Sequence, residues 1–293
     1  MKFSGLYTAL VTPFNGNKSI DYIALDKLFA EQVEARVDGL VILGTTGESP
    51  TVDEREGEEI VKRAVKASNG KVKIIMGTGS NDTKIAVQKS KKAQDLGADA
   101  ILCVNPYYNK PTQEGLYQHF MSIADGSDIP MILYNIKGRT AVNLEIKTLM
   151  KLAQHERIVG IKEASGDLVQ IMNVIKSVPQ NFAVLSGDDV LTYPIMCLGG
   201  HGVVSVASNV LPMEMKNMVW EIFTGNFDSA KKRHYKLYNL MISLLSLSSN
   251  PIPIKSLLAY LGKIQEEFRL PLCSMSEEAR EELVKHYEES ISG

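Results

Sequence analysis

The sequence predicts an α/β protein, specifically a (β/α)8 TIM barrel with a C-terminal helical extension. Over its first two thirds, eight short apolar runs rich in Val, Ile and Leu alternate with longer amphipathic segments. The runs lack the polar alternation of a half-exposed strand, which is typical of parallel strands buried on both faces. Their starts recur roughly every 20 to 35 residues, the length of one βα unit, and eight strands favour a closed barrel over an open sheet.

The expected elements alternate in chain order. The strands cover residues 5–11, 40–43, 72–76, 100–104, 131–134, 158–161, 183–185 and 203–206. The helices between them cover residues 22–36, 54–67, 83–96, 113–124, 144–153 and 168–177. Four helices are directly preceded by a short oxygen-bearing side chain that can accept hydrogen bonds from the first turn, namely Asp21, Asp53, Asp82 and Thr112.

The chain is expected to have two parts, a barrel over residues 1–210 that carries the active site and an extension over residues 211–293. The strand pattern stops after Asn209, and the remainder reads as helix throughout, punctuated by Pro and Gly. No linker-like segment precedes the extension, so we expect it to pack on the barrel. Residues 240–247 are too apolar for a solvated helix, which predicts burial against the barrel or a partner subunit.

Composition excludes several classes of protein. The 293 residues carry a net charge of −2, which argues against a nucleic-acid or anionic-membrane binder. No stretch approaches the ~18 uninterrupted apolar residues of a membrane span, and the N-terminal residues 1–3 lead into no signal-peptide cleavage site. Cys103, Cys197 and Cys273 are widely spaced, which suits buried thiols in a reducing compartment. We therefore expect a cytoplasmic protein.

Lys162 is the strongest candidate for chemistry, because active sites of barrels lie where strands end and it directly follows the run 158–161. Desolvation there would lower its pKa from about 10.4 and free the amine to attack a carbonyl. The alternative is a solvated lysine paired with Glu163 at the rim. Tyr134 ends the preceding strand and can relay protons to a Schiff base. The alternative interpretation of Tyr134 is a structural one, in which its ring covers the barrel core and its hydroxyl is in water.

Two further features suit the binding of carboxylates. The loop 44–49 offers backbone N–H groups and the hydroxyls of Thr45 and Thr46, whereas it lacks the pattern of a phosphate-binding P-loop. Arg139 can hold a second carboxylate with its planar guanidinium, or it can be a solvated loop arginine. The histidines lie away from the strand ends, and the aspartates at 188–189 have no accompanying ligands. Neither a His-based triad nor a metal site is therefore indicated.

Many short segments, in order along nearly the whole chain, carry a resemblance to a known family. They are residues 9–14 (ALVTPF), 44–49 (GTTGES), 77–79 (GTG), 106–109 (PYYN), 134–135 (YN), 160–164 (GIKEA), 186–189 (SGDD), 199–202 (GGHG), 250–255 (NPIPIK) and 269–272 (RLPL). Together they resemble the dihydrodipicolinate synthase family within the pyruvate-dependent class I aldolases. The resemblance implies condensation of pyruvate with aspartate 4-semialdehyde, in lysine and diaminopimelate biosynthesis, with no metal or organic cofactor.

The resemblance also implies roles for the reacting groups. Lys162 matches the lysine that forms an imine with pyruvate. A hydroxyl relay of protons is matched by Thr45, Tyr134 and Tyr108. In the family the tyrosine at Tyr108 reaches in from a neighbouring subunit, within a homotetramer built from two tight dimers. Imine formation makes the methyl group of pyruvate an enamine nucleophile, in agreement with the chemistry expected of a desolvated lysine.

Binding residues follow from the same match. Thr46 matches a contact to the pyruvate carboxylate, and Gly187 and Val204 match positions lining that pocket. Arg139 matches the arginine that binds the carboxylate of aspartate 4-semialdehyde. Lys137 departs from the family, since relatives commonly have proline there. We expect the loop that orients Arg139 to be less rigid and more basic as a result.

Two other functions remain open at this stage. One is another pyruvate aldolase of the superfamily, such as N-acetylneuraminate lyase or a 2-keto-3-deoxy sugar-acid aldolase. Thr46, Arg139 and the tyrosine pair at 107–108 favour the synthase over these enzymes. The other is an inactive barrel that binds a keto acid as a regulator. A lysine accompanied by a full proton relay argues against that, because a non-enzyme has no use for one.

Feedback inhibition by lysine, common among relatives, is expected to be weak or absent. Three elements of the family's allosteric pocket, at the tight-dimer interface, are matched by Ser49, Asn81 and Tyr107. The position that supplies a carboxylate to the ligand's α-amine aligns with Ile85, however, and two histidine positions align with Glu54 and Gly57. Loss of a charged acceptor for a buried ammonium costs several kcal/mol.

Overall fold

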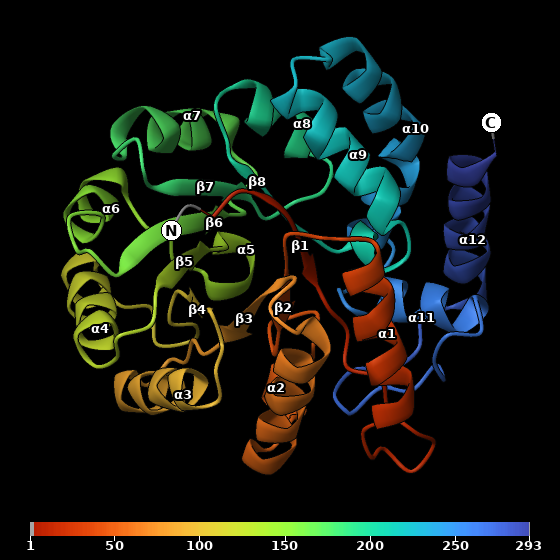
Figure 1. Cartoon of the computed structure of the whole chain (residues 1–293), viewed down its shortest axis with the longest axis horizontal. Helices are drawn as coiled ribbons and strands as arrows, with labels where there is room; N and C mark the ends of the chain where they lie inside the picture. Colours follow the sequence, from red (N-terminus) through yellow and green to blue (C-terminus); the bar gives the residue numbers. More distant parts are fainter. Residues whose placement is uncertain (1–2, 293) are drawn as a thin grey trace.

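Eight parallel strands form a closed barrel in the computed structural model, which describes residues 3–292 (Figure 1). Each strand pairs with the next, and β8 pairs with β1 to close the ring. The strands are β1 (Gly5–Ala9), β2 (Gly39–Ile42), β3 (Lys73–Gly77), β4 (Ala100–Val104), β5 (Met131–Asn135), β6 (Ile158–Glu163), β7 (Ala183–Ser186) and β8 (Gly202–Ser205). The predicted barrel and its eight strands are confirmed. The extreme ends of the predicted parts, residues 1–2 and 293, lie outside the described residues.

Helices surround the barrel and connect its strands. They are α1 (Tyr22–Glu34), α2 (Glu54–Ser68), α3 (Thr83–Asp95), α4 (Gln113–Asp125), α5 (Lys137–Thr140), α6 (Ile146–Leu152), α7 (Leu168–Ser177) and α8 (Thr192–Cys197), with 3-10 turns η1 (Ser49–Thr51) and η2 (Ala207–Asn209). The four predicted N-caps are confirmed, since each side chain accepts a hydrogen bond from the first turn of its helix. The sequence did not predict α5 and α8, because so short a helix shows little periodicity.

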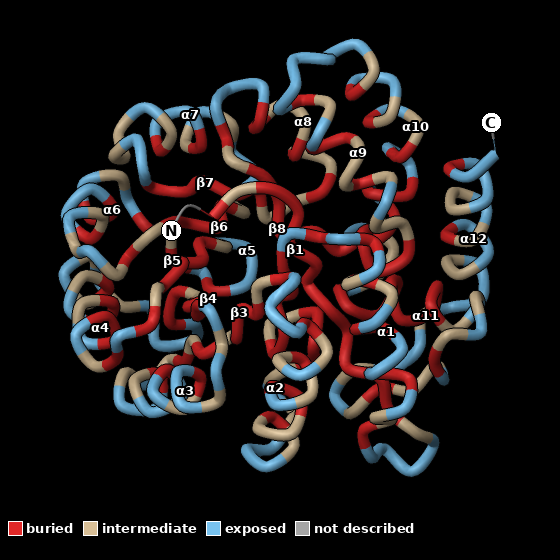
Figure 2. The backbone as a smooth tube through the Cα atoms, in the orientation of Figure 1, coloured by how far each residue is buried: buried red, intermediate tan, exposed pale blue. Residues whose placement is uncertain are grey.

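The residues of the strands are buried (Figure 2), and their side chains fall into two apolar layers. One layer fills the barrel interior with Phe3, which precedes β1, and with residues from alternate strand positions: Tyr7, Ala9, Val41, Ile75, Ala100, Leu102, Ile132, Tyr134, Ala183, Leu185 and Val204. The other lies between the strands and the surrounding helices. This double burial explains why the strand runs show no polar alternation.

The pairing of β5 with β6 contains a one-residue register shift. Met131 pairs with Ile158, but the next residue of β5, Ile132, pairs with Gly160. Val159 is therefore an extra residue in β6, a β-bulge. Beyond it Lys162 stands opposite Tyr134, on the face of the strand that points into the barrel.

The C-terminal extension consists of α9 (Pro212–Phe223), α10 (Phe227–Ser246), α11 (Ile252–Tyr260) and α12 (Glu277–Ile291). Helix α9 packs on β1, while α12 packs on α10 and α11 at the outer edge (Figure 1). The expectation of helix throughout is wrong for residues 261–276, which form no regular element. Gly262, with φ of 67°, adopts the left-handed conformation that ends a helix. Within the apolar stretch 240–247, Leu244 is buried but Leu245 is partly exposed.

The surface departs from one expectation. Cys103 is buried, but Cys197 and Cys273 are exposed, so the prediction of buried thiols is wrong for two of three cysteines. Cys197 ends the outer helix α8, and Cys273 lies in the irregular segment 261–276. Within residues 3–292, no helix combines the length and apolar character needed to cross a bilayer.

Candidate active site

Lys162 lies where the sequence placed it, at the carboxyl end of β6. Its side chain is 7% exposed, and its Nζ stands 4.3 Å from the centroid of the Tyr134 ring. The two residues are register partners on adjacent strands, which fixes their side chains on the same interior face. A cation or amine over an aromatic face is held by the ring quadrupole and by dispersion. The lysine amine is therefore held in an enclosed position near a phenol.

Glu163 faces the opposite way, so the predicted alternative of a Lys162–Glu163 pair at the rim is wrong. The Glu163 carboxylate accepts hydrogen bonds from Asn135 Nδ2 at 3.1 Å and from the backbone N–H of Ser165 at 2.8 Å. Gln170 of α7 adds a third donor. This carboxylate is satisfied between the barrel and its helices, and the lysine amine is left to the interior.

Two adjoining cavities open above Lys162. The inner cavity, of about 110 Å³, is bordered by Lys162 itself and by Thr45, Thr46, Tyr134, Arg139, Gly187, Asp188, Val206, Leu245 and Asn250, among others. The outer cavity, of about 320 Å³, shares Thr45, Tyr134, Arg139 and Asn250 with it and continues toward Glu48, Tyr107 and Leu272. The two connected cavities are therefore lined by strand ends, by barrel loops and by the extension.

The loop 44–49 is held from two sides. The Thr12 hydroxyl donates to the Gly47 carbonyl at 2.7 Å, which ties the loop to the end of β1. Asn250 of the extension donates from Nδ2 to the Thr46 hydroxyl oxygen at 3.0 Å. Thr46 is buried, whereas Thr45 is half-buried and borders both cavities. The two threonines are therefore presented to the cavity on a fixed backbone.

Gly187 leaves the room that the lysine occupies. A Cβ at this position would lie 3.0 Å from Lys162 Cε and 2.6 Å from Ala164 Cβ. The neighbouring Asp188 also borders the inner cavity. Burial, followed by the charge of Asp189, raises the pKa of Asp188 to about 6. Asp189 does not reach the cavity, because its Oδ2 accepts from the N–H groups of Val206 and Ala207.

Arg139 borders both cavities from α5. Its Nη2 donates to the Asn250 carbonyl at 3.1 Å, so the extension orients the guanidinium. Val204 was expected to line the pocket, but it lies deeper in the barrel interior, and Val206 forms the wall instead. Val204 belongs to β8, whereas Val206 follows the strand end and so stands one layer higher.

Tyr108 does not join the site of its own chain. Tyr108 is 91% exposed and lines neither cavity. Its backbone is in the left-handed region, with φ of 73°. Tyr107, the preceding residue, borders the outer cavity. In the part of the chain that the structure describes, no three His, Cys, Asp or Glu side chains gather as metal ligands.

Sequence reasoning missed two polar residues of the site. Asn250 appeared only within a matching segment, and its contact with Thr46 spans 204 positions that no local pattern can reveal. Asp188 appeared within a matching segment and was otherwise weighed only as a metal ligand. Its place after β7, in line with the other strand ends, was the signal that it could serve the site.

A buried lysine amine at the strand ends of a (β/α)8 barrel, with a phenol and hydroxyls on the same cavity, is the arrangement of an aldolase that works through a Schiff base. The chain belongs to one such family, because the Dihydrodipicolinate synthetase family model matches residues 2–290. Members of that family are lyases of the class I aldolase type, and the resemblance found in the sequence is confirmed.

Individual relatives are similar over nearly their whole length. The chain is 47% identical to the 4-hydroxy-tetrahydrodipicolinate synthase of Endomicrobium trichonymphae, over 97% of each protein. A solved monomeric variant of a dihydrodipicolinate synthase is 43% identical, with a TM-score of 0.96 over 98% of this chain and 97% of that one. The chloride-inhibited enzyme of Acinetobacter baumannii, solved in complex with pyruvate, is 40% identical, with a TM-score of 0.95 over 98% of each chain.

The packing at Gly187 generates a prediction. Gly187→Ala should slow formation of a covalent adduct between Lys162 and a keto acid by about ten- to a hundredfold, because the new Cβ displaces the amine. Borohydride trapping followed by intact-mass measurement gives the rate. Gly16→Ala is the matched control, since its Cβ would meet nothing closer than 3.7 Å. Equal trapping rates for the Gly187 variant and the control would contradict the prediction.

Proposed function

We propose that this chain condenses pyruvate with aspartate 4-semialdehyde through a Schiff base on Lys162, the reaction of a 4-hydroxy-tetrahydrodipicolinate synthase. The observation that carries the proposal is the enclosed Lys162 amine, 4.3 Å from the Tyr134 ring centroid, on a cavity shared with Thr45 and Thr46. The name of the Endomicrobium relative and the pyruvate bound to the Acinetobacter relative support it.

The reaction starts at the keto carbon of pyruvate. The neutral Lys162 amine adds to that carbon, a C–N bond forms, and the former carbonyl oxygen leaves as water after protonation. The Tyr134 phenol, beside the amine, is the group that delivers and recovers these protons, and Thr45 extends the relay along the shared cavity wall. Loss of a proton from the methyl group then gives an enamine.

The enamine carbon is the nucleophile toward the second substrate. It forms a C–C bond with the aldehyde carbon, whose oxygen takes up a proton. The α-amino group of the second substrate then adds to the imine carbon, which closes the ring and releases the Lys162 amine. Every proton taken up in one step is returned in another, so lysine and tyrosine end the cycle as they began.

Carboxylate binding divides between two regions of the cavity. The Thr46 hydroxyl and the N–H groups of its loop suit the carboxylate of pyruvate, close to Lys162. Arg139, held by the Asn250 carbonyl, suits the carboxylate of the longer substrate in the outer cavity. Lys137 is exposed at the start of α5 and adds positive charge nearby.

Covalent labelling at Lys162 tests the proposal. Incubation with pyruvate and borohydride should add one pyruvate-derived mass, and peptide mapping should place it on Lys162, because this amine borders the inner cavity beside a phenol that can relay protons. Lys137, exposed on α5, is the internal control for non-specific reaction. Attachment at Lys137, or no adduct, would contradict the mechanism. A product assay with aspartate 4-semialdehyde or N-acetylmannosamine then separates the synthase from the lyase.

The same proposal includes self-association as a homotetramer, a dimer of dimers. Tyr108 is 91% exposed and away from its own cavity, as a residue that serves the site of a neighbouring copy must be. Exposed apolar side chains that a partner could cover also occur at Val169 and Met172 on α7 and at Leu198, directly after α8. A solved relative described as a monomeric variant supports an oligomeric form for the family.

Mixed subunits test the shared site. Lys162→Ala and Tyr108→Phe chains should each be inactive, and mixing them should restore activity to roughly a quarter of the wild-type value per chain, because a mixed dimer contains one intact site. The measurement is the condensation rate after subunit exchange, which native mass spectrometry of a tagged chain verifies. Mixed dimers that form without regaining activity would contradict the arrangement.

A cytoplasmic location is also part of the proposal. The three cysteines are unpaired, and two of them are exposed. Exposed thiols persist in a reducing compartment and oxidise readily outside it.

Weak inhibition by lysine is the last part of the proposal. A cavity of about 500 Å³ between α2 and α3 is bordered by Ser49, Glu54, Gly57 and Ile85, among other residues. Ile85 is 42% exposed at this cavity, and its side chain accepts no hydrogen bond. An ammonium group next to it gains neither a hydrogen bond nor a counter-charge from that side chain.

A dose–response curve checks this expectation. Half-inhibition should require more than about 1 mM lysine, which corresponds to less than about 4 kcal/mol of binding. Ile85→Glu should increase the sensitivity because it supplies a carboxylate, and Ile85→Gln, of similar size without the charge, is the matched control. Half-inhibition of the wild type well below 1 mM would contradict the expectation.

A further inference from the structure

An ion pair between the barrel and the extension is shut off from solvent. Lys255 Nζ lies 2.5 Å from Glu48 Oε1, and the two side chains are 0% and 1% exposed. The Phe14 and Phe268 rings cover the ammonium, with centroids 4.3 and 4.9 Å from Nζ. Burial lowers the pKa of Lys255, and the neighbouring Glu48 carboxylate opposes that shift. The Glu48 carboxylate therefore stabilises the charged form of Lys255 in this buried position.

The pair connects directly to the threonine loop. Glu48 has a left-handed backbone, with φ of 52°, and its N–H donates to the Thr45 carbonyl at 3.1 Å. The same extension supplies Asn250, whose Nδ2 donates to the Thr46 hydroxyl. Thr45 is therefore hydrogen-bonded to Glu48, which pairs with Lys255 of the extension. Thr46 is hydrogen-bonded to Asn250, which belongs to the extension itself.

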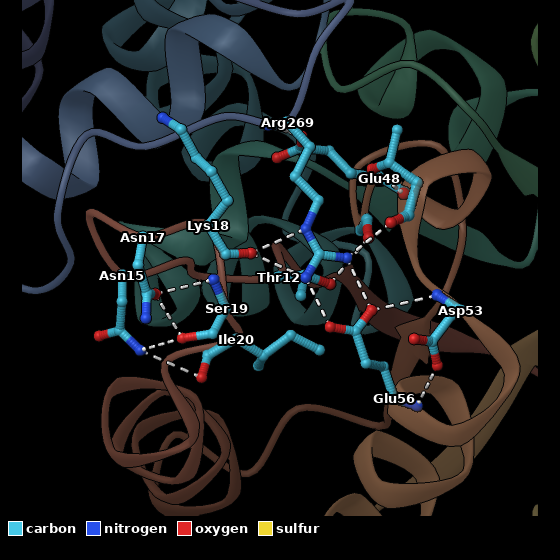
Figure 3. A network of polar contacts seen from close by, with 12 residues as sticks. Thr12, Asn15, Asn17, Lys18, Ser19, Ile20, Glu48, Asp53, Glu56 and Arg269 are labelled. Atoms are coloured by element: carbon cyan, nitrogen blue, oxygen red, sulfur yellow. Dashed lines mark hydrogen bonds and ion pairs between the residues drawn. The ribbon is translucent and has the colours of Figure 1, made fainter.

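Arg269 provides a second clamp around the same loop (Figure 3). Its guanidinium contacts both Glu56 carboxylate oxygens, at 2.5 and 2.6 Å, and donates to the Thr51 carbonyl at 2.6 Å. Its backbone N–H donates to Glu48 Oε2 at 3.4 Å. The extension therefore reaches Glu48 from two separate segments, α11 and the irregular segment 261–276.

Stability alone is a poor reason for such a pair. The cost of desolvating two charges often exceeds their attraction, and apolar residues of similar volume are frequently as stable or more so. An ion pair does restrict geometry, because charge and hydrogen bonds tolerate few arrangements. Glu48 also borders the outer cavity, and its carboxylate is buried against Lys255, so loss of Lys255 would leave a buried charge without its counter-ion next to that cavity.

We propose that Lys255 and Glu48 are positioning residues, which hold Thr45 and Thr46 in place for the pyruvate carboxylate and keep the buried charge of Glu48 neutralised within the same loop. The inference rests on the proposed function, because it assumes that the loop 44–49 binds the carboxylate of pyruvate. Neither residue touches the reacting atoms. Their effect is on how tightly pyruvate binds before the imine forms.

The test measures the pyruvate concentration that gives half-maximal borohydride labelling of Lys162. Lys255→Met should raise this concentration by about tenfold or more, because it leaves an unpaired carboxylate near the substrate. The double variant Lys255→Met/Glu48→Gln should recover most of the loss, since no buried charge remains. Lys263→Met is the matched control: Lys263 ties the extension to Glu31 of α1 at 2.6 Å, on the outside of the barrel. It should change the value by less than about twofold.

The outcomes separate this inference from the proposed function. A wild-type chain that pyruvate does not label overturns the proposed function, and the positioning role with it. If the wild type is labelled normally, an unchanged half-maximal concentration in Lys255→Met overturns the positioning role alone. A double variant with a half-maximal concentration as high as that of the single variant also overturns it. Should Lys255→Met not fold, Lys255→Arg replaces it. Lys255→Arg keeps the positive charge but displaces the contact with Glu48, so it should raise the half-maximal pyruvate concentration by about threefold. Lys263→Arg, its control, should leave that concentration unchanged.

Discussion

One extra residue in β6 decides which side chain reaches the cavity. Without Val159 as a bulge, Ile161 would stand opposite Tyr134, and Lys162 would point at the helices. With it, the amine of Lys162 faces the interior and the carboxylate of Glu163 faces outward to Asn135. A Glu163 carboxylate on the interior face would lie against the amine, where the keto acid has to reach it. The register shift therefore separates two adjacent charges to opposite sides of one strand, and the proposed chemistry depends on that separation.

The site is assembled from both ends of the chain around this strand. Thr46 follows β2, whereas Asn250 belongs to the extension and contacts both Thr46 and Arg139. The barrel thus supplies the lysine and most of the hydroxyls, and the extension sets the positions of the groups suited to carboxylates. This division explains why the extension is packed so tightly at the start of α11, where residues from Ile252 to Leu258 are buried.

Local patterns were enough to predict the strands, the caps and the strand-end lysine. Asp53, for example, precedes a helix and caps it as expected, because that interaction involves neighbours in sequence. Non-local features escaped prediction. The run 158–161 is apolar at every position, so no alternation reveals that Val159 is extra. Asn250 approaches Thr46 only through the tertiary fold, and no local pattern reveals that Cys197, at the end of α8, is exposed.

The link between Glu48 and Lys255 spans 207 positions, which has a consequence for synthesis. At ~5–20 residues per second, the ribosome makes Lys255 roughly 10 to 40 s after Glu48. Throughout that interval the nascent barrel carries a loop carboxylate without its counter-ion. Lys255 must also leave the ribosome before the pair can close. Contacts so distant along the chain also slow folding, because the intervening segment must be ordered first. A polypeptide released early can therefore contain all eight strands and still lack a finished site.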